Sequence, residues 1–270
     1  MLLLNPGLHN KLNQTMTIKM KKYITLLILS ALGLITIYSC KKDYSKTVAS
    51  YVPAMGNYAF IKVINGTVGS AGTYVYQDAL NEPMSGYALS STGYFPTTTA
   101  YAALYQGNRS IIIKDTTTNT AQKAINYTGS FAAGNYYTIF MYDTAASAKY
   151  ILVQDKLETP TDTTARIRFA NLIYSSTPVA NVDIFSTRMN TNLFTNVSVG
   201  QVTDFAPFAT RNTDTLYVRS TGTTTNLAQA SITATSGRSY TAVFEGRYQT
   251  TTGTYKASNP TRSLLIYTNR

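Results

Sequence analysis

The pattern of apolar and polar positions divides the chain into one continuous apolar run and a long region of alternation. The run covers residues 23–38 and contains no charged residue. From residue 58 onward, short segments with alternating apolar residues are separated by turn residues, without a convincing stretch of helical period. Alternation of this kind indicates half-buried strands. The sequence therefore predicts an all-β protein that follows an N-terminal apolar segment.

The predicted strands fall into two groups on either side of the polar segment Thr159-Pro160-Thr161-Asp162. About seven short strands per hundred residues is typical of a β-sandwich. We therefore predict two sandwiches, at 57–157 and 164–270, joined by a linker at 158–163. The predicted strands are 58–65, 73–77, 101–105, 110–114, 122–127, 135–142 and 150–153 in the first group, and 165–172, 182–186, 215–220, 229–234, 239–247 and 263–268 in the second.

The two groups resemble copies of one another. The clearest match places Gly134-Asn135-Tyr136-Tyr137-Thr138 beside Gly237-Arg238-Ser239-Tyr240-Thr241. In both, glycine permits a turn before a strand. We expect Tyr137 and Tyr240 to have a structural role like that of the tyrosine corner, with the hydroxyl bonded to upstream backbone. Further matches pair 61–65 with 167–171, 101–104 with 205–208, and 111–114 with 216–219.

The second copy resembles a known family in four segments, 165–171, 182–185, 199–202 and 237–244. These are similar to the domain of unknown function 4397, which is found in exported bacterial proteins, often in tandem. The resemblance implies two tandem immunoglobulin-like β-sandwiches. It covers 164–248 well and 57–142 less well, because 73–76 lacks an acidic residue equivalent to Asp183. The family has no established catalytic residues, so the resemblance implies a fold and a location only.

The apolar run has the features of a secretory signal. Lys21 and Lys22 precede it, and Ser39 and Cys40 follow it. This order resembles the lipobox of bacterial lipoproteins, in which cleavage leaves a cysteine that is then acylated. We predict a signal peptide at 1–39, lipidation of Cys40 and a tether at 40–56. The alternative is an uncleaved transmembrane anchor, although the run is shorter than the about 18 apolar residues expected of one.

The true start of translation is expected at Met16 or Met20, which would make 1–15 or 1–19 a mis-assigned start. Cleavage before Cys40 would remove the only histidine, His9, and would leave the only cysteine at the lipidation site. It would also lower the formal net charge from +11 to +7, because four of the 23 basic residues precede the cut. The remaining basic residues are dispersed, whereas a nucleic-acid site would show a basic stripe. We expect a membrane partner through the lipid and no nucleic-acid partner.

The residue types that remain argue against most catalytic chemistry. Without histidine, the chain lacks the usual base for a serine or cysteine nucleophile and the usual ligands of zinc. Acidic residues are spread thinly, and the one cluster, 155–158 with Asp162, is interpreted as a solvated hinge between the sandwiches rather than a calcium site. We expect no enzymatic activity, no cofactor and no metal.

The remaining candidates for binding are aromatic, since the chain has 22 tyrosines and 10 phenylalanines. Tyr94, Phe95 and Tyr101 flank the loop 96–99, where they are candidates to stack on a sugar or contact a protein. The alternative is that these rings pack in the core. We expect a non-enzymatic cell-envelope lipoprotein of the outer membrane for display, adhesion or assembly, with an envelope protein or a glycan as partner. The alternative is a glycan-binding accessory module of a nutrient-uptake system.

Overall fold

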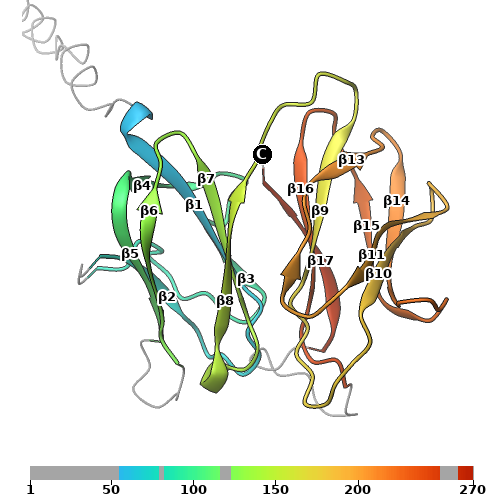
Figure 1. Ribbon diagram of the computed structural model, residues 1–270, viewed down its shortest axis with the longest axis horizontal. Helices are drawn as coiled ribbons and strands as arrows, with labels where there is room; N and C mark the ends of the chain where they lie inside the picture. Colours follow the sequence, from blue (N-terminus) through green and yellow to red (C-terminus); the bar gives the residue numbers. More distant parts are fainter. Residues whose placement is uncertain (1–54, 79–81, 116–122, 250–260, 270) are drawn as a thin grey trace, which may run out of the picture. The chain divides into compact units, whose positions relative to one another are not determined.

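The computed structural model describes residues 55–78, 82–115, 123–249 and 261–269 (Figure 1). Residues Met55–Arg270 form one compact unit. The predicted signal peptide, Cys40 and the tether as far as residue 54 lie outside the described residues. No helix among the described residues is long and apolar enough to cross a membrane.

The first sandwich is built from strands β1 to β8, which form two sheets. One sheet has the order β3-β1-β7-β8, with β4 also paired to β1, and the other has the order β2-β5-β6. β1 and β7 are parallel, and the other pairs are antiparallel. The elements are the 3-10 turns η1 (Met55–Asn57) and η2 (Ala145–Ser147), and the strands β1 (Tyr58–Asn65), β2 (Tyr74–Gln77), β3 (Gly93–Phe95), β4 (Ala102–Tyr105), β5 (Gly107–Lys114), β6 (Ile125–Phe131), β7 (Tyr136–Tyr142) and β8 (Lys149–Asp155).

The second sandwich follows with strands β9 to β17. One sheet has the order β12-β9-β16-β17, with β13 also paired to β9, and the other has the order β11-β10-β14-β15. The strands are β9 (Ala165–Asn171), β10 (Val182–Ser186), β11 (Thr191–Val197), β12 (Gln201–Val202), β13 (Ala206–Phe208), β14 (Thr213–Ser220), β15 (Asn226–Thr233), β16 (Ser239–Glu245) and β17 (Ser263–Thr268).

The two sandwiches repeat the same pairing. β9 and β16 are parallel neighbours, as β1 and β7 are. The short strands β4 and β13 pair with β1 and β9 in the same register, so that Leu104 lies opposite Ala59 and Phe208 lies opposite Ala165. The repeat seen in the sequence is therefore a repeat of topology. Within the described residues, β11 is an addition of the second sandwich.

Each sandwich has its own apolar core between its two sheets. Alternate residues of β1 and β9, including Ile61, Val63, Ile167 and Phe169, point into these cores and are fully buried. This alternation is the pattern from which the strands were predicted. The all-β sandwich fold class is confirmed.

The strands that the sequence pattern did not predict are short or polar. β3 and β12 are too short to show alternation, and β11 is exposed at most of its positions. β13 contains Pro207, which cannot donate a backbone hydrogen bond and which the sheet tolerates because β13 lies at an edge. The missed strands are thus edge strands, which periodicity describes poorly.

The turns before β7 and β16 have the conformation expected from their glycines. Gly134 and Gly237 have φ angles of 74° and 76°, which favour glycine. The hydroxyl of Tyr137 accepts a hydrogen bond from the backbone N–H of Ala132 at 3.1 Å, and that of Tyr240 accepts one from Thr235 at 3.0 Å. Both tyrosines therefore fasten their strand to the backbone five residues upstream.

A third apolar cluster joins the two sandwiches. Ile64 and Phe140 of the first sandwich pack with Val243 and Tyr267 of the second, and all four are buried. These residues lie on the outer faces of the β3-β1-β7-β8 and β12-β9-β16-β17 sheets, away from the two cores. The sandwiches therefore share a packed interface, and residues 158–163 connect them without a helix or strand of their own.

Candidate functional site

A buried polar network lies in the interface between the sandwiches. Its two cations, Lys62 on β1 and Arg168 on β9, occupy equivalent positions of the repeat and are 0% and 1% exposed. Buried charges are costly unless they are paired and hydrogen-bonded. The partners of these two cations therefore determine how the interface is built.

Arg168 forms an ion pair that crosses the interface. Its Nη1 lies 2.5 Å from Oδ1 of Asp155, which ends β8 of the first sandwich. Its Nε donates to the Thr241 hydroxyl at 2.9 Å. The guanidinium also lies over two rings, with its central carbon 4.6 Å from the centre of Phe205 and 5.1 Å from that of Phe140. Arg168 is thus held by charge, by hydrogen bonds and by aromatic faces.

Both carboxylate oxygens of Asp155 accept hydrogen bonds. Oδ1 accepts from Arg168, and Oδ2 accepts from the hydroxyls of Tyr101 and Thr138, each at 2.5 Å. This placement corrects the interpretation of 155–158 as a solvated hinge, because Asp155 is buried. Asp162 lies elsewhere, accepting from the backbone N–H of Thr164 at 2.9 Å. In the part of the chain that the structure describes, no three potential metal-ligating side chains come together.

Among the described residues, Lys62 donates no hydrogen bond to a carboxylate. Its Nζ donates to the carbonyl of Thr268 in the second sandwich at 3.0 Å and lies 4.8 Å from the centre of the Tyr101 ring. Burial lowers the pKa of Lys62 to about 8, although the charge of Asp155 opposes the shift. At the position equivalent to Asp155, the second sandwich has the neutral Asn269, whose amide donates to the Tyr101 hydroxyl at 2.9 Å.

A buried carboxyl, Glu245, lies in the same interface. It is 0% exposed, and its Oε1 lies 3.4 Å from the hydroxyl of Tyr267, while Oε2 has no hydrogen-bond partner. The Tyr267 hydroxyl also donates to the carbonyl of Thr92 in the first sandwich at 3.1 Å. Burial raises the pKa of Glu245 to about 8. Near neutral pH, this side chain is therefore mainly a neutral acid.

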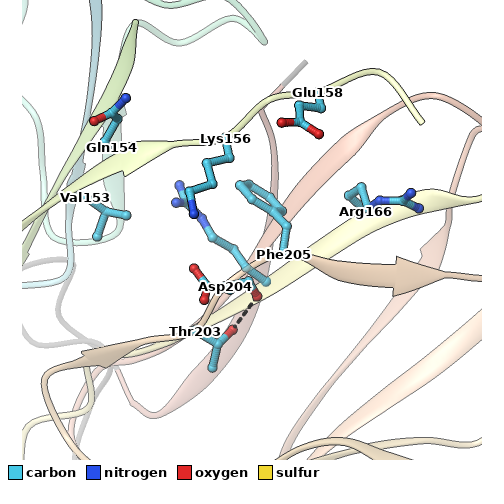
Figure 2. A pocket seen from close by; sticks show the side chains of 9 residues that line it. Val153, Gln154, Lys156, Glu158, Arg166, Thr203, Asp204 and Phe205 are labelled. Atoms are coloured by element: carbon cyan, nitrogen blue, oxygen red, sulfur yellow. Dashed lines mark hydrogen bonds between the residues drawn. The ribbon is translucent and has the colours of Figure 1, made fainter. Parts of the chain in front are cut away.

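One hollow of about 300 Å³ lies beside the Arg168 end of the network (Figure 2). Lys156 and Glu158 reach it from the segment after β8, and Asp204 and Phe205 reach it from the connection between β12 and β13. The hydroxyl of Thr203 donates to the carbonyl of Asp204 at 3.1 Å and shapes that connection. The lining thus carries charges of both signs. We call it the mixed-charge hollow.

A second hollow of about 310 Å³ lies beside Tyr101 and Asn269. Three rings line it: Phe60 and Tyr136 are stacked with centres 4.9 Å apart, and Tyr101 meets Tyr136 edge-on at 5.1 Å. We call it the aromatic hollow. Its lining residues are Phe60, Thr99, Ala100, Tyr101, Tyr136, Leu157, Arg238 and Asn269. Leu157 is buried, whereas its neighbours Lys156 and Glu158 are exposed and line the mixed-charge hollow.

The three aromatic residues expected to bind a partner do not form one site. Tyr101 lines the aromatic hollow, and its position in the network raises its pKa through burial and through the charge of Asp155. Tyr94 packs edge-on against Tyr267 with ring centres 5.0 Å apart, so it contributes to the interface. The prediction that Phe95 binds a partner is wrong, because its side chain is buried in the core of the first sandwich.

Other residues of the aromatic hollow were missed as binding candidates. Tyr136 and Arg238 lie within the matched glycine-containing segments, which were interpreted only as turns before structural tyrosines. In a strand, Tyr136 points to the face opposite Tyr137. Its outward direction was therefore available from the sequence, but its meeting with Phe60 depends on the parallel pairing of β1 and β7.

The fold and the interface define a class of protein, two packed β-sandwiches, rather than a known activity. Residues 59–184 match the model of the family described as Domain of unknown function (DUF4397). The match covers the first sandwich from Ala59 onward but only β9 and the first residues of β10 in the second. This distribution differs from our expectation of a stronger resemblance in the second copy. A search of curated proteins gave no match.

The ion pair between Arg168 and Asp155 predicts a large loss of stability in the Arg168→Met variant. Removing the cation leaves Asp155 buried without its charge partner, which costs about 3–5 kcal/mol of the free energy of unfolding. The double variant with Asp155→Asn is expected to recover much of this loss, since the amide oxygen still accepts from Tyr101 and Thr138. Urea unfolding of both variants measures the difference. Equal stability of the single and double variants would contradict the pairing.

Glu245 predicts a pH-dependent gain in the Glu245→Gln variant. The ordinary pKa is 4.5, and the folded pKa is about 8. Below pH 4.5 the acid is neutral in both states. Between these values the unfolded state ionises first, so wild-type stability falls with rising pH. The variant's advantage should grow from pH 5 to 8 with a slope approaching about 1.4 kcal/mol per pH unit.

Urea unfolding at several pH values measures this advantage. Glu158→Gln serves as a matched control for a glutamate that faces water. An advantage of Glu245→Gln that stays constant between pH 5 and 8 would show that Glu245 is ionised in the folded protein.

Proposed function

We propose that this protein is a non-enzymatic cell-envelope lipoprotein that serves in surface display, adhesion or assembly. The sequence supports a lipid anchor at Cys40, and the family match supports an exported β-sandwich. The tether between the anchor and β1 would hold the two sandwiches away from an outer-membrane surface. The partner is an envelope protein or a glycan.

The observation that carries this proposal is the buried interface. Arg168 and Asp155 pair across it, and Ile64, Phe140, Val243 and Tyr267 pack around it. Two sandwiches joined in this way form one compact unit, as a display or adhesion module requires when it transmits force or holds a surface at a fixed distance. The buried charges serve the packing in this proposal, since Asp155 is committed to three donors.

The lipid anchor is tested by the Cys40→Ala variant. Cells that express the wild-type chain and are grown with radioactive palmitate are expected to yield a labelled protein in the membrane fraction. The variant should carry no label, because it lacks the thiol that is acylated. Replacement of a nearby residue, as in Ser45→Ala, serves as the control. Equal label in the wild type and in Cys40→Ala would contradict the lipoprotein proposal.

The aromatic hollow favours a second candidate function, a glycan-binding accessory module of a nutrient-uptake system. Phe60, Tyr101 and Tyr136 offer ring faces and edges at the surface of a concave site. Ring faces pack well against the C–H groups of sugars, and tyrosine hydroxyls supply polar contacts. A volume of about 310 Å³ is at the lower end of the about 300–1,000 Å³ common for ligand sites.

A glycan array probed with the purified protein tests this second function. Tyr136→Ala is expected to weaken binding to any recognised glycan about tenfold, which corresponds to about 1.4 kcal/mol, because it removes the central ring of the hollow. Tyr150→Ala is the matched control, since Tyr150 is an exposed tyrosine outside the hollow. The absence of any bound glycan, or an equal effect of the two variants, would contradict glycan binding at this site.

A further inference from the structure

We propose that the aromatic hollow binds an acidic saccharide and that Arg238 binds the carboxylate of that sugar. This inference rests on glycan binding at the hollow, the second function proposed above, and adds the chemical class of the ligand. It follows from the charge of the lining, from the commitments of its polar groups and from a comparison with the mixed-charge hollow.

Among the described residues, the lining of the aromatic hollow contains a single charged residue. Arg238 supplies a positive charge, and the other lining residues are aromatic, aliphatic or neutral and polar. An arginine guanidinium presents a planar set of donors that matches a carboxylate in a bidentate arrangement. The charge balance of the hollow therefore favours an anionic ligand over a neutral or cationic one.

The backbone of Arg238 is fixed, while its side chain is exposed. The backbone N–H of Arg238 donates to the carbonyl of Thr235 at 3.2 Å, and the carbonyl of Arg238 accepts from the backbone N–H of Arg166 at 2.9 Å. Gly237, with its φ of 76°, sets the turn that places Arg238 immediately before β16. Among the described residues, the recorded ion pairs do not include Arg238. The turn thus holds the backbone of Arg238 at the hollow, and the exposed guanidinium is available to an anion.

The neutral polar groups of the hollow are largely committed to the protein. The Tyr101 hydroxyl donates to Asp155 and accepts from Asn269, and the Asn269 oxygen accepts from Thr241 at 2.6 Å. Tyr101 therefore presents mainly its ring to a ligand. A sugar ring would pack on these aromatic side chains, and specificity for its substituents would come chiefly from Arg238.

The mixed-charge hollow provides an internal comparison, because its Arg166 and Phe205 occupy the repeat positions of Phe60 and Tyr101. There the Arg166 guanidinium lies 3.6 Å from the carboxylate of Asp162. Arg166 is therefore paired within the protein, and the other cations of that hollow, Lys156 and Arg168, share its lining with the carboxylates of Glu158 and Asp204. The Phe205 ring lies against Arg168 in the same way as the Tyr101 ring lies against Lys62, so the two hollows differ in the cation rather than in this ring. The aromatic hollow retains an exposed cation beside ring surface, which is why we place the ligand there.

Calorimetric titration of the full chain tests the inference. The probes are trisaccharides of galacturonate and of mannuronate, each compared with the same trisaccharide after reduction of its carboxyls to alcohols. We expect at least one acidic trisaccharide to bind at least tenfold more tightly than its reduced form. Arg238→Gln should weaken the acidic ligand at least tenfold and leave the reduced ligand unchanged. Arg211→Gln, which alters an exposed arginine outside the hollow, should change neither.

The outcomes separate this inference from glycan binding itself. If acidic and reduced trisaccharides bind equally, or if Arg238→Gln has no more effect than Arg211→Gln, the acidic ligand class is overturned and glycan binding remains. If the array reveals only neutral glycans, the result is the same. If no saccharide binds the full chain, both proposals fail. Thermal unfolding of both variants shows whether a loss of affinity reflects the site or the fold.

Discussion

The burial of two cations between the sandwiches is the constraint on which the rest of the structure depends. Lys62 and Arg168 descend from one position of the repeat, and each would be exposed if its sandwich stood alone, because that face of the sheet would meet water. In the paired protein both are buried, and Asp155 is an acid close enough to act on both. Arg168 pairs directly with Asp155, whereas burial lowers the pKa of Lys62 to about 8 against the opposing charge of Asp155.

The sandwich cores could be predicted from the sequence because they depend on local alternation. Residues such as Ile61 and Ile167 show the period of two that a half-buried strand requires. The interface was missed for the opposite reason. Its residues, among them Lys62, Thr138 and Thr241, are polar positions of the same strands, and alternation predicts that polar positions face solvent. These positions are buried by the other sandwich. The alternation within one strand shows only which residues face the core of its own sandwich.

The candidate site shows the same division. Tyr101 was found because it adjoins a loop rich in threonine, and composition near a loop is visible in the sequence. Phe95 was misplaced because a strand of three residues is too short to reveal which side faces the core. Arg238 and Phe60 lie far apart in the chain and meet only through the parallel pairing within each sandwich and the contact between them. Such proximity is a product of the complete fold.

The equivalence of the two halves has a consequence for how this protein can be divided. Gly66 and Leu172 hold the same position of the repeat and lie against each other, since a Cβ on Gly66 would come within 3.0 Å of Leu172. The two sandwiches thus contact each other through equivalent faces, as the two subunits do in the isologous contact of a symmetric dimer. The chain therefore resembles a dimer whose subunits are fused. Each sandwich alone would expose the apolar and charged residues of the interface to water. Cutting the chain at 158–163 and separating the sandwiches would expose both interface faces. Lys62 and Arg168, which are now buried, would then be solvated by water or paired with a new partner.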